Sequence, residues 1–401
     1  MEVEIGRGKK ARRAYGFDDI AIVPSRRTRD PDEIDITWTL GPYRFELPLL
    51  ASAMDGVVSP ETAGVIGKLG GLAVLNLEGI WCRYEDADER LQEISEAPVE
   101  QATRMMQEIY AEPVKPELIG KRVEEIKAMG AVACGSLTPQ KVTAWHQEAL
   151  DAGLDILVIQ GTVISAEHVS NASEPLNLKE FIGGLPIPCV VGGCASYNTG
   201  LHLMRTGAVG VLVGVGPGAA CTTRGVLGIG VPQATAIADV AAARSQHMME
   251  TGQYCNVIAD GGMRNGGDIS KAIACGADAV MIGSPLARGK EAPGRGFHWG
   301  MATFHPSLPR GTRVATHQDG TLEEILLGPA KENDGTFNLM GALRTSMATC
   351  GYEDIPAFHR AEVMVAPALQ SEGKALQRQQ SVGMGSNGRA AVAAGVAADD
   401  D

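Results

Sequence analysis

The sequence predicts an α/β protein that forms one closed (β/α)8 barrel, a TIM barrel. Three observations lead to this fold class: eight short apolar runs, helix-length segments between them, and a recurring order of helix, glycine and apolar run. Eight units of similar length without a break in composition favour a closed barrel. A doubly wound open sheet is the alternative.

The apolar runs are typical of buried parallel strands, which are rich in Val, Ile, Leu and Ala on both faces. They cover residues 47–53, 72–77, 131–134, 156–159, 189–191, 209–213, 257–259 and 279–282. Helices are expected at 60–69, 139–152, 197–206, 233–251 and 269–275. The phrases LGGLAVL, AMGAVAC, AGLDILV, TGAVGVLV and CGADAVMIG each end a helix at glycine and lead into a strand.

Three segments depart from this repeat. Residues 85–117 are polar with a helical pattern, and they predict a surface insertion too short for a second domain. Residues 289–320, rich in Gly, Pro, His and Arg, predict a long active-site flap. The composition of residues 371–401 predicts a disordered tail, which leaves residues 1–370 as one catalytic domain.

Composition narrows the range of partners. The 401-residue chain has a net charge of −13, which disfavours nonspecific binding to nucleic acid or to an anionic membrane. The eight cysteines show no CxxC spacing, and the N-terminus has no apolar signal region. No uncharged apolar stretch is long enough to span a bilayer. We therefore expect reduced thiols, a cytoplasmic protein and a small-molecule substrate.

The most informative motif is GVGPGAACTTR, residues 214–224. An apolar run leads directly into it, so Cys221 is expected at the carboxyl end of a buried strand, where barrel enzymes place their active sites. Three glycines before the cysteine allow the backbone to approach a ligand closely. The competing interpretation is an inert buried cysteine in a tight turn.

Residues that follow the other predicted strands should gather at the same end of the barrel. The loops after strands seven and eight, Asp260-Gly261-Gly262 and Gly283-Ser284, are typical of a phosphate site, and Asp260 could accept hydrogen bonds from sugar hydroxyls. The remaining strand-end residues are Ser52, Met54, Asp55, Gln160, Gly161, Thr162, Gly192, Gly193, Cys194, Gly216, Gly218 and Thr223.

Together these motifs resemble the IMP dehydrogenase and GMP reductase superfamily over about residues 12–352. The resemblance is carried by SAMDGV, GVGPGAACTTR with GIGVPQATAI, VIADGG, MIGSPLA, WGMA and GALRTSM. It implies a barrel enzyme, usually a homotetramer and in some cases an octamer, that binds a purine nucleoside monophosphate and a nicotinamide cofactor, NAD or NADP.

The resemblance also implies roles for individual residues. Cys221 would attack C2 of the purine to form a covalent adduct, with Thr223 positioning cofactor or water and Arg310 as a catalytic residue of the flap. Substrate-binding residues would be Ser52, Met54, Gly218, Asp260, Gly262, Gly283, Ser284, Gly300, Met301 and Gly311. Gln160, Gly161, Thr162, Gly214 and Gly216 would bind the cofactor. Carbonyls of Gly216, Gly218 and Cys221 could hold a monovalent cation such as potassium.

The chain also departs from the family pattern. Ala219 replaces a phosphate-binding serine, Leu212 a basic residue, Cys194 an asparagine, and Gln160 an aspartate that takes the cofactor ribose. The flap is short and lacks the Arg-Tyr pair that activates water in the dehydrogenases. The insertion at 85–117 is too short for the regulatory CBS modules, so nucleotide control through them is not expected.

Replacements for the missing water activator must come from the flap, and the possible side chains there are Arg295, His298, His305, Arg310, Arg313 and His317. Each has an ordinary alternative as a solvated loop residue. Three functions remain open: an NAD-dependent IMP dehydrogenase making XMP, which the motifs favour; an NADPH-dependent GMP reductase making IMP; and a nucleotide-binding relative with little or no turnover.

Overall fold

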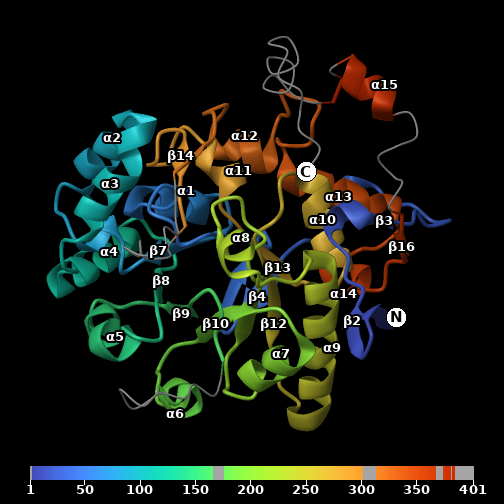
Figure 1. The fold of residues 1–401 in the computed structure, drawn as a ribbon, viewed down its shortest axis with the longest axis horizontal. Helices are drawn as coiled ribbons and strands as arrows, with labels where there is room; N and C mark the ends of the chain where they lie inside the picture. The colour runs from blue at the N-terminus through green and yellow to red at the C-terminus, as the bar shows by residue number, and fades with distance from the viewer. Residues whose placement is uncertain (1, 166–175, 301–312, 367–373, 381, 384–401) are drawn as a thin grey trace.

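The computed structural model describes residues 2–165, 176–300, 313–366, 374–380, 382 and 383. Eight parallel strands form a closed barrel in the order β10-β11-β12-β13-β6-β7-β8-β9 (Figure 1). The strands are β6 (Leu49–Ala51), β7 (Leu72–Asn76), β8 (Cys134–Leu137), β9 (Ile156–Gln160), β10 (Cys189–Cys194), β11 (Gly210–Val213), β12 (Asn256–Asp260) and β13 (Ala279–Ile282). The predicted barrel is confirmed.

The third strand lies later in the chain than the sequence predicted. We expected residues 131–134, whereas β8 is Cys134–Leu137. The apolar residues before it take a different partner: the backbone N–H of Ala133 donates to Oδ2 of Asp155 at 2.8 Å. Gly135 and Ser136 in the observed strand have low strand propensity, which hid it. Gly135 lies there because Leu77 packs against it, where a Cβ would be 2.6 Å from Leu77 Cδ1.

Helices surround the barrel and cover its outer surface (Figure 1). The sequence placed α1, α5, α7, α9 and α10 within a few residues of their observed bounds. The helices are α1 (Pro60–Lys68), α2 (Ala87–Glu96), α3 (Val99–Tyr110), α4 (Pro116–Ala128), α5 (Val142–Asp151), α6 (Leu178–Gly183), α7 (Tyr197–Met204), α8 (Thr223–Leu227), α9 (Gln233–Thr251), α10 (Gly266–Ala274), α11 (Ser284–Ala287), α12 (Leu322–Leu327), α13 (Leu339–Thr349), α14 (Ile355–Phe358) and α15 (Lys374–Gln379). No helix in the described ranges is long and apolar enough to cross a bilayer.

Short antiparallel pairs complete the fold. They are β1 (Glu2–Gly6) with β2 (Lys9–Arg12), β3 (Ile20–Ile22) with β16 (Val363–Val365), β4 (Trp38–Leu40) with β5 (Tyr43–Phe45), and β14 (Phe297–His298) with β15 (Val314–Ala315). The β14–β15 pair forms the base of the predicted flap. Residues 301–312, the centre of that flap, lie outside the described residues, as does most of the predicted tail apart from α15.

Two apolar layers form the core, because successive strand residues point to opposite faces of the sheet. Leu212 and Ile258 belong to the layer inside the barrel, while their neighbours Val213 and Val257 pack against the outer helices. The hairpin β4–β5 contributes Trp38, Leu40 and Phe45 to the inner layer. Trp38, Leu40 and Phe45 are not adjacent in sequence to any predicted site residue.

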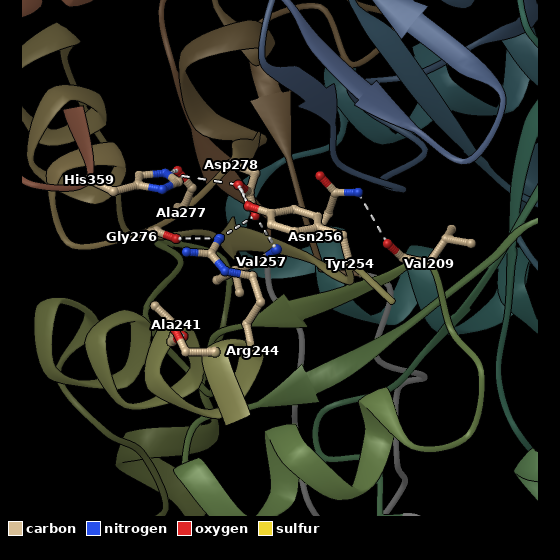
Figure 2. Close-up of polar contacts among 11 residues, drawn as sticks. Val209, Ala241, Arg244, Tyr254, Asn256, Val257, Gly276, Ala277, Asp278 and His359 are labelled. Atoms are coloured by element: carbon tan, nitrogen blue, oxygen red, sulfur yellow. Dashed lines mark hydrogen bonds and ion pairs between the residues drawn. The ribbon is translucent and has the colours of Figure 1, made fainter. Parts of the chain in front are cut away.

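A polar cluster around the buried Asp278 and Arg244 lies at the amino ends of β12 and β13 (Figure 2). Asp278 Oδ2 accepts hydrogen bonds from Arg244 Nη1 and from the backbone N–H of Val257, both at 2.7 Å. Tyr254 donates its hydroxyl to Asp278 Oδ1 at 2.5 Å. His359 Nε2 lies 3.9 Å from the same oxygen. The cluster ties α9 and the region of α14 to the barrel at the end opposite the predicted site.

Candidate functional site

The alternation of side chains along the strands sets which residues face the inside of the barrel at its carboxyl end. Counting two residues on from the last inner-layer residue of each strand gives inward positions. These positions are Ser52, Asn76, Ser136, Gln160, Gly192, Gly214, Asp260 and Gly283. Five of them were predicted as ligand-binding residues. Asn76 and Ser136 were missed, because a polar residue within a strand gives no local signal that it faces a ligand.

Gln160 and Asp260 meet across the interior of the barrel. Nε2 of Gln160, at the end of β9, donates to Oδ2 of Asp260 at 3.1 Å and lies 3.8 Å from the sulfur of Met281. Oε1 of Gln160 is buried and has no hydrogen-bond partner among the described residues. Burial raises the pKa of Asp260 to about 7, against the lowering effect of the Gln160 hydrogen bond. The carboxyl group is thus balanced between its two protonation states near neutral pH.

Cys221 is placed as a reactive thiol would be. All eight cysteines lie in the described part of the chain, and Cys221 alone is exposed. Its Sγ donates to Oγ1 of Thr223 at 3.2 Å. Burial raises the pKa of the other thiols, for example that of Cys275 to about 11, which makes them poor nucleophiles. This exposure contradicts the interpretation of Cys221 as a buried, inert cysteine.

The loop that carries Cys221 is held by two side chains that sequence reasoning did not assign. Arg224 reaches back to both ends of the segment, with Nε 3.3 Å from the carbonyl of Val215 and Nη2 2.7 Å from that of Val231. Gly216 has φ of +75°, and a Cβ there would lie 2.7 Å from Arg224 Cγ. A glycine is therefore needed where the arginine closes the loop.

Gln233 joins the loop to the neighbouring strand. Its Nε2 lies 2.8 Å from the carbonyl of Val213, 3.0 Å from that of Asp260 and 3.3 Å from that of Gly261. The side chain is buried at the start of α9. Its place in the motif GIGVPQATAI could have indicated this role, but a single glutamine at the start of a helix is common and does not by itself predict such contacts.

The Cys221 loop (residues 214–224) and the Asp260 turn (residues 260–262) lie against each other. A Cβ on Gly261 would be 3.4 Å from the backbone nitrogen of Gly218, and one on Gly262 would be 2.9 Å from Pro217 Cβ. Both glycines have positive φ, +78° and +82°. The structure thus brings Gly218, Asp260 and Gly262 together, as expected for one binding site.

The loops after β6 and β13 also meet. A Cβ on Gly283 would lie 2.6 Å from the sulfur of Met54 and 3.5 Å from Oγ of Ser52. Ser284 begins α11, and its hydroxyl lies 2.8 Å from Nε2 of His298. Burial lowers the pKa of His298 to about 4, so its ring is neutral at pH 7. Nδ1 of His298 has no partner among the described residues.

The 85–117 insertion is attached to this site. Its helix α3 places the hydroxyl of Tyr110 so that it donates to Oδ2 of Asp55, and Trp299 Nε1 donates to the same hydroxyl oxygen at 2.7 Å. Asp55 also accepts from the backbone N–H of Ile80 at 3.1 Å. Burial raises its pKa to about 6, and the Tyr110 hydrogen bond opposes that rise. Figure 1 shows α2 and α3 beside β14.

Two arginines of the flap base also contact α2. Arg295 forms an ion pair with Asp88 at 2.7 Å. Arg313 donates to the carbonyls of Ser95 and Ala97, at 3.2 and 3.0 Å, and lies over the ring of Phe297. The insertion therefore holds both sides of the flap base.

These contacts reduce the set of possible water activators. Arg295 and Arg313 are engaged by α2, and buried His298 is engaged by Ser284. His317 is exposed. His305 and Arg310 lie outside the described residues, together with the predicted substrate residues Met301 and Gly311. The prediction that Arg310 acts in catalysis stays a prediction.

The predicted cofactor residues lie beside the Cys221 loop. A Cβ on Gly193 would be 2.5 Å from the carbonyl of Gly214, 3.4 Å from that of Thr162 and 3.6 Å from that of Gly161. Gly161 and Thr162 are partly exposed. Of the three carbonyls proposed for a cation, that of Gly218 accepts a hydrogen bond from Cys221 N at 2.9 Å. A carbonyl oxygen retains a second lone pair for a ligand.

Comparisons with known proteins agree with this geometry. Residues 14–375 match the IMP dehydrogenase / GMP reductase domain. An uncharacterized oxidoreductase of Mycolicibacterium smegmatis is 48% identical over 90% of this chain and 99% of its own length. The inosine-5′-monophosphate dehydrogenase of Methanocaldococcus jannaschii is 26% identical over 90% of this chain and 95% of its own. A crystal structure of an IMP dehydrogenase/GMP reductase-like protein from Corynebacterium glutamicum superposes with a TM-score of 0.86, at 45% identity, covering 91% of this chain and 97% of that one.

Proposed function

Because the chain belongs to the IMP dehydrogenase / GMP reductase family of oxidoreductases, we propose that it is an NAD-dependent IMP dehydrogenase. The observation that carries the proposal is the exposed Cys221, with its thiol on Thr223, in a loop packed against the Asp260 turn. That turn offers a carboxyl group for a ribose and glycine amides for a phosphate.

The nucleotide would lie between the Cys221 loop and the Asp260 turn on one side and the loops after β6 and β13 on the other. Its phosphate would be held by Gly262, Gly283 and Ser284, its ribose by Asp260, and its base would contact Met54 and the loop around Gly218. Ser52 and Met54 pack against Gly283, so the loops after β6 and β13 are in contact. Gly300 follows Trp299 at the end of the described flap base and would face the base of the nucleotide.

Catalysis would begin at Cys221. Its sulfur adds to C2 of the purine as a thiolate, and a hydride leaves C2. NAD supplies the acceptor for that hydride when it is bound. Water then adds to C2 and the bond to sulfur breaks, which releases XMP and restores the thiol. Thr223, which accepts from the Cys221 thiol in this structure, would position the sulfur or the water.

Gly161, Thr162, Gly214 and Gly216 would bind the cofactor. The partly exposed loop of Gly161 and Thr162 lies against Gly193, one residue before the end of β10 and beside the strand that leads to Cys221. This position fits a dinucleotide that must reach the reacting carbon. The carbonyls of Gly216, Gly218 and Cys221 would take a monovalent cation such as potassium, and a homotetramer is the expected assembly.

A GMP reductase is the second candidate. The observation that favours it is the compact flap. Arg295 and Arg313 at the base of the flap are engaged by α2 and its C-terminal end, so the described residues of the flap offer no free arginine to activate water. A reductase needs no hydrolytic water, since it releases ammonia from GMP and receives a hydride. The two reactions are separated by absorbance at 340 nm, with IMP and NAD in one sample and GMP and NADPH in another.

A further inference from the structure

We infer that Gln160 and Asp260 together recognise the vicinal diol of the substrate's ribose, each taking one hydroxyl, so that Gln160 is a determinant of ribonucleotide specificity rather than a cofactor residue. This inference rests on the proposed nucleotide-binding function.

The Gln160 amide is held in one orientation by its neighbours. Its nitrogen faces two groups that attract a donor, the carboxylate oxygen of Asp260 at 3.1 Å and the sulfur of Met281 at 3.8 Å. The opposite orientation would set the amide oxygen against the carboxylate. The nitrogen is therefore fixed on Asp260, and the oxygen is left as the free acceptor.

Oε1 of Gln160 is buried and has no partner among the described residues. A buried acceptor without a hydrogen bond costs about 1–3 kcal/mol, so a ligand that donates to Oε1 would recover that free energy. The neighbouring Asp260 carboxyl, whose pKa burial raises to about 7, accepts a hydrogen bond from Gln160 on Oδ2 and has lone pairs left for a further donor. The two side chains can therefore both accept O–H donors, and a vicinal diol supplies two adjacent ones.

A glycine beside Gln160 leaves room for its side chain. Gln160 pairs in register with Gly192 on β10, the strand next to β9. A side chain at Gly192 would collide with Leu212, where a Cβ would be 2.4 Å from Leu212 Cβ. Gly192 therefore places no side chain inside the barrel next to Gln160, and the Gln160 amide can extend from β9 to Asp260 at the end of β12.

The test is equilibrium binding of IMP, 2′-deoxy-IMP and 3′-deoxy-IMP to the full-length protein without dinucleotide, measured by calorimetry. The variant Gln160→Met removes the amide and keeps the length of the side chain. Gln147→Met is the matched control, because it makes the same substitution at an exposed glutamine of α5, outside the site, whose Nε2 also donates to a carboxylate, that of Asp151, at 2.7 Å. Binding of NAD in the presence of IMP is measured for each protein in the Cys221→Ala background, in which IMP and NAD should not react.

The wild-type protein and Gln147→Met should bind each deoxynucleotide about tenfold more weakly than IMP, since each deoxynucleotide lacks one donor to a buried acceptor. Gln160→Met should lose one of these two penalties and keep the other, with NAD binding unchanged. The inference is overturned if wild type binds all three nucleotides equally, if Gln160→Met keeps both penalties, or if it alters only NAD binding. Failure to bind any purine nucleotide would instead overturn the proposed function itself.

Discussion

Nε2 of His298 lies 2.8 Å from Oγ of Ser284, so a buried histidine of the flap base fixes the hydroxyl that begins α11. Sequence reasoning assigned Ser284 to the phosphate and considered His298 only as a water activator. The contact joins His298 to the predicted phosphate-binding loop, and we propose that His298 orients the Ser284 hydroxyl toward the phosphate of the nucleotide.

Replacement of His298 by phenylalanine should weaken binding of IMP about three- to tenfold, because the Ser284 hydroxyl loses the partner that orients it. Calorimetry with IMP and with inosine measures this effect. Inosine has no phosphate and should bind the variant as it binds wild type. An equal loss for both ligands would show that His298 has only a structural role.

The affinity for inosine should rise about tenfold between pH 6 and pH 8. Burial raises the pKa of Asp260 to about 7, so its carboxyl is mostly protonated at pH 6 and mostly ionised at pH 8. Hydroxyl donors of the ribose stabilise the ionised form, so binding strengthens as the proton leaves. Inosine avoids the titration of a phosphate near pH 6. The variant Asp260→Asn should show a flat profile, and a rise that persists in this variant would exclude Asp260 as its cause.

The barrel and most strand-end residues could be predicted from sequence because local patterns encode them: apolar runs mark the strands, and glycine clusters mark the turns. Contacts between distant segments were not predictable in the same way. The pairs Gln160 with Asp260 and Ser284 with His298 join residues 100 and 14 positions apart, and neither pair leaves a periodic signal. β8 begins later than predicted: the N–H of Ala133 donates to the Asp155 side chain, although its carbonyl accepts from the N–H of Ile156 at the start of β9.

The insertion should contribute to both stability and substrate binding through Tyr110. Tyr110→Phe removes the hydroxyl between Trp299 and Asp55, leaving two buried polar groups with fewer partners. We expect a loss of about 1–3 kcal/mol in the free energy of unfolding and a raised KM for the nucleotide. Tyr84→Phe is the control, because the Tyr84 hydroxyl donates to the Ile109 carbonyl within the insertion rather than to a residue of the site. If both variants behave alike, the insertion does not act through the flap base.

The polar cluster of Figure 2 should affect stability alone. Asp278→Asn leaves Arg244 buried without its counter-ion and should lower the free energy of unfolding by about 3 kcal/mol, measured with urea. Tyr254→Phe, which removes one hydrogen bond to Asp278, should cost about 1 kcal/mol. Turnover per folded molecule should be unchanged in both, because the cluster lies at the amino ends of the strands. A loss of kcat in the folded variants would contradict this separation.

The central claim is that Cys221 is the nucleophile of an NAD-dependent IMP dehydrogenase. The most direct measurement is absorbance at 340 nm with IMP and NAD, for wild type and for Cys221→Ala, with IMP binding measured in both. The account predicts a rise for wild type and none for the variant, which should still fold and bind IMP. A fall with GMP and NADPH, and no rise with IMP and NAD, would make the protein a reductase. Undiminished NADH formation by Cys221→Ala would contradict the account.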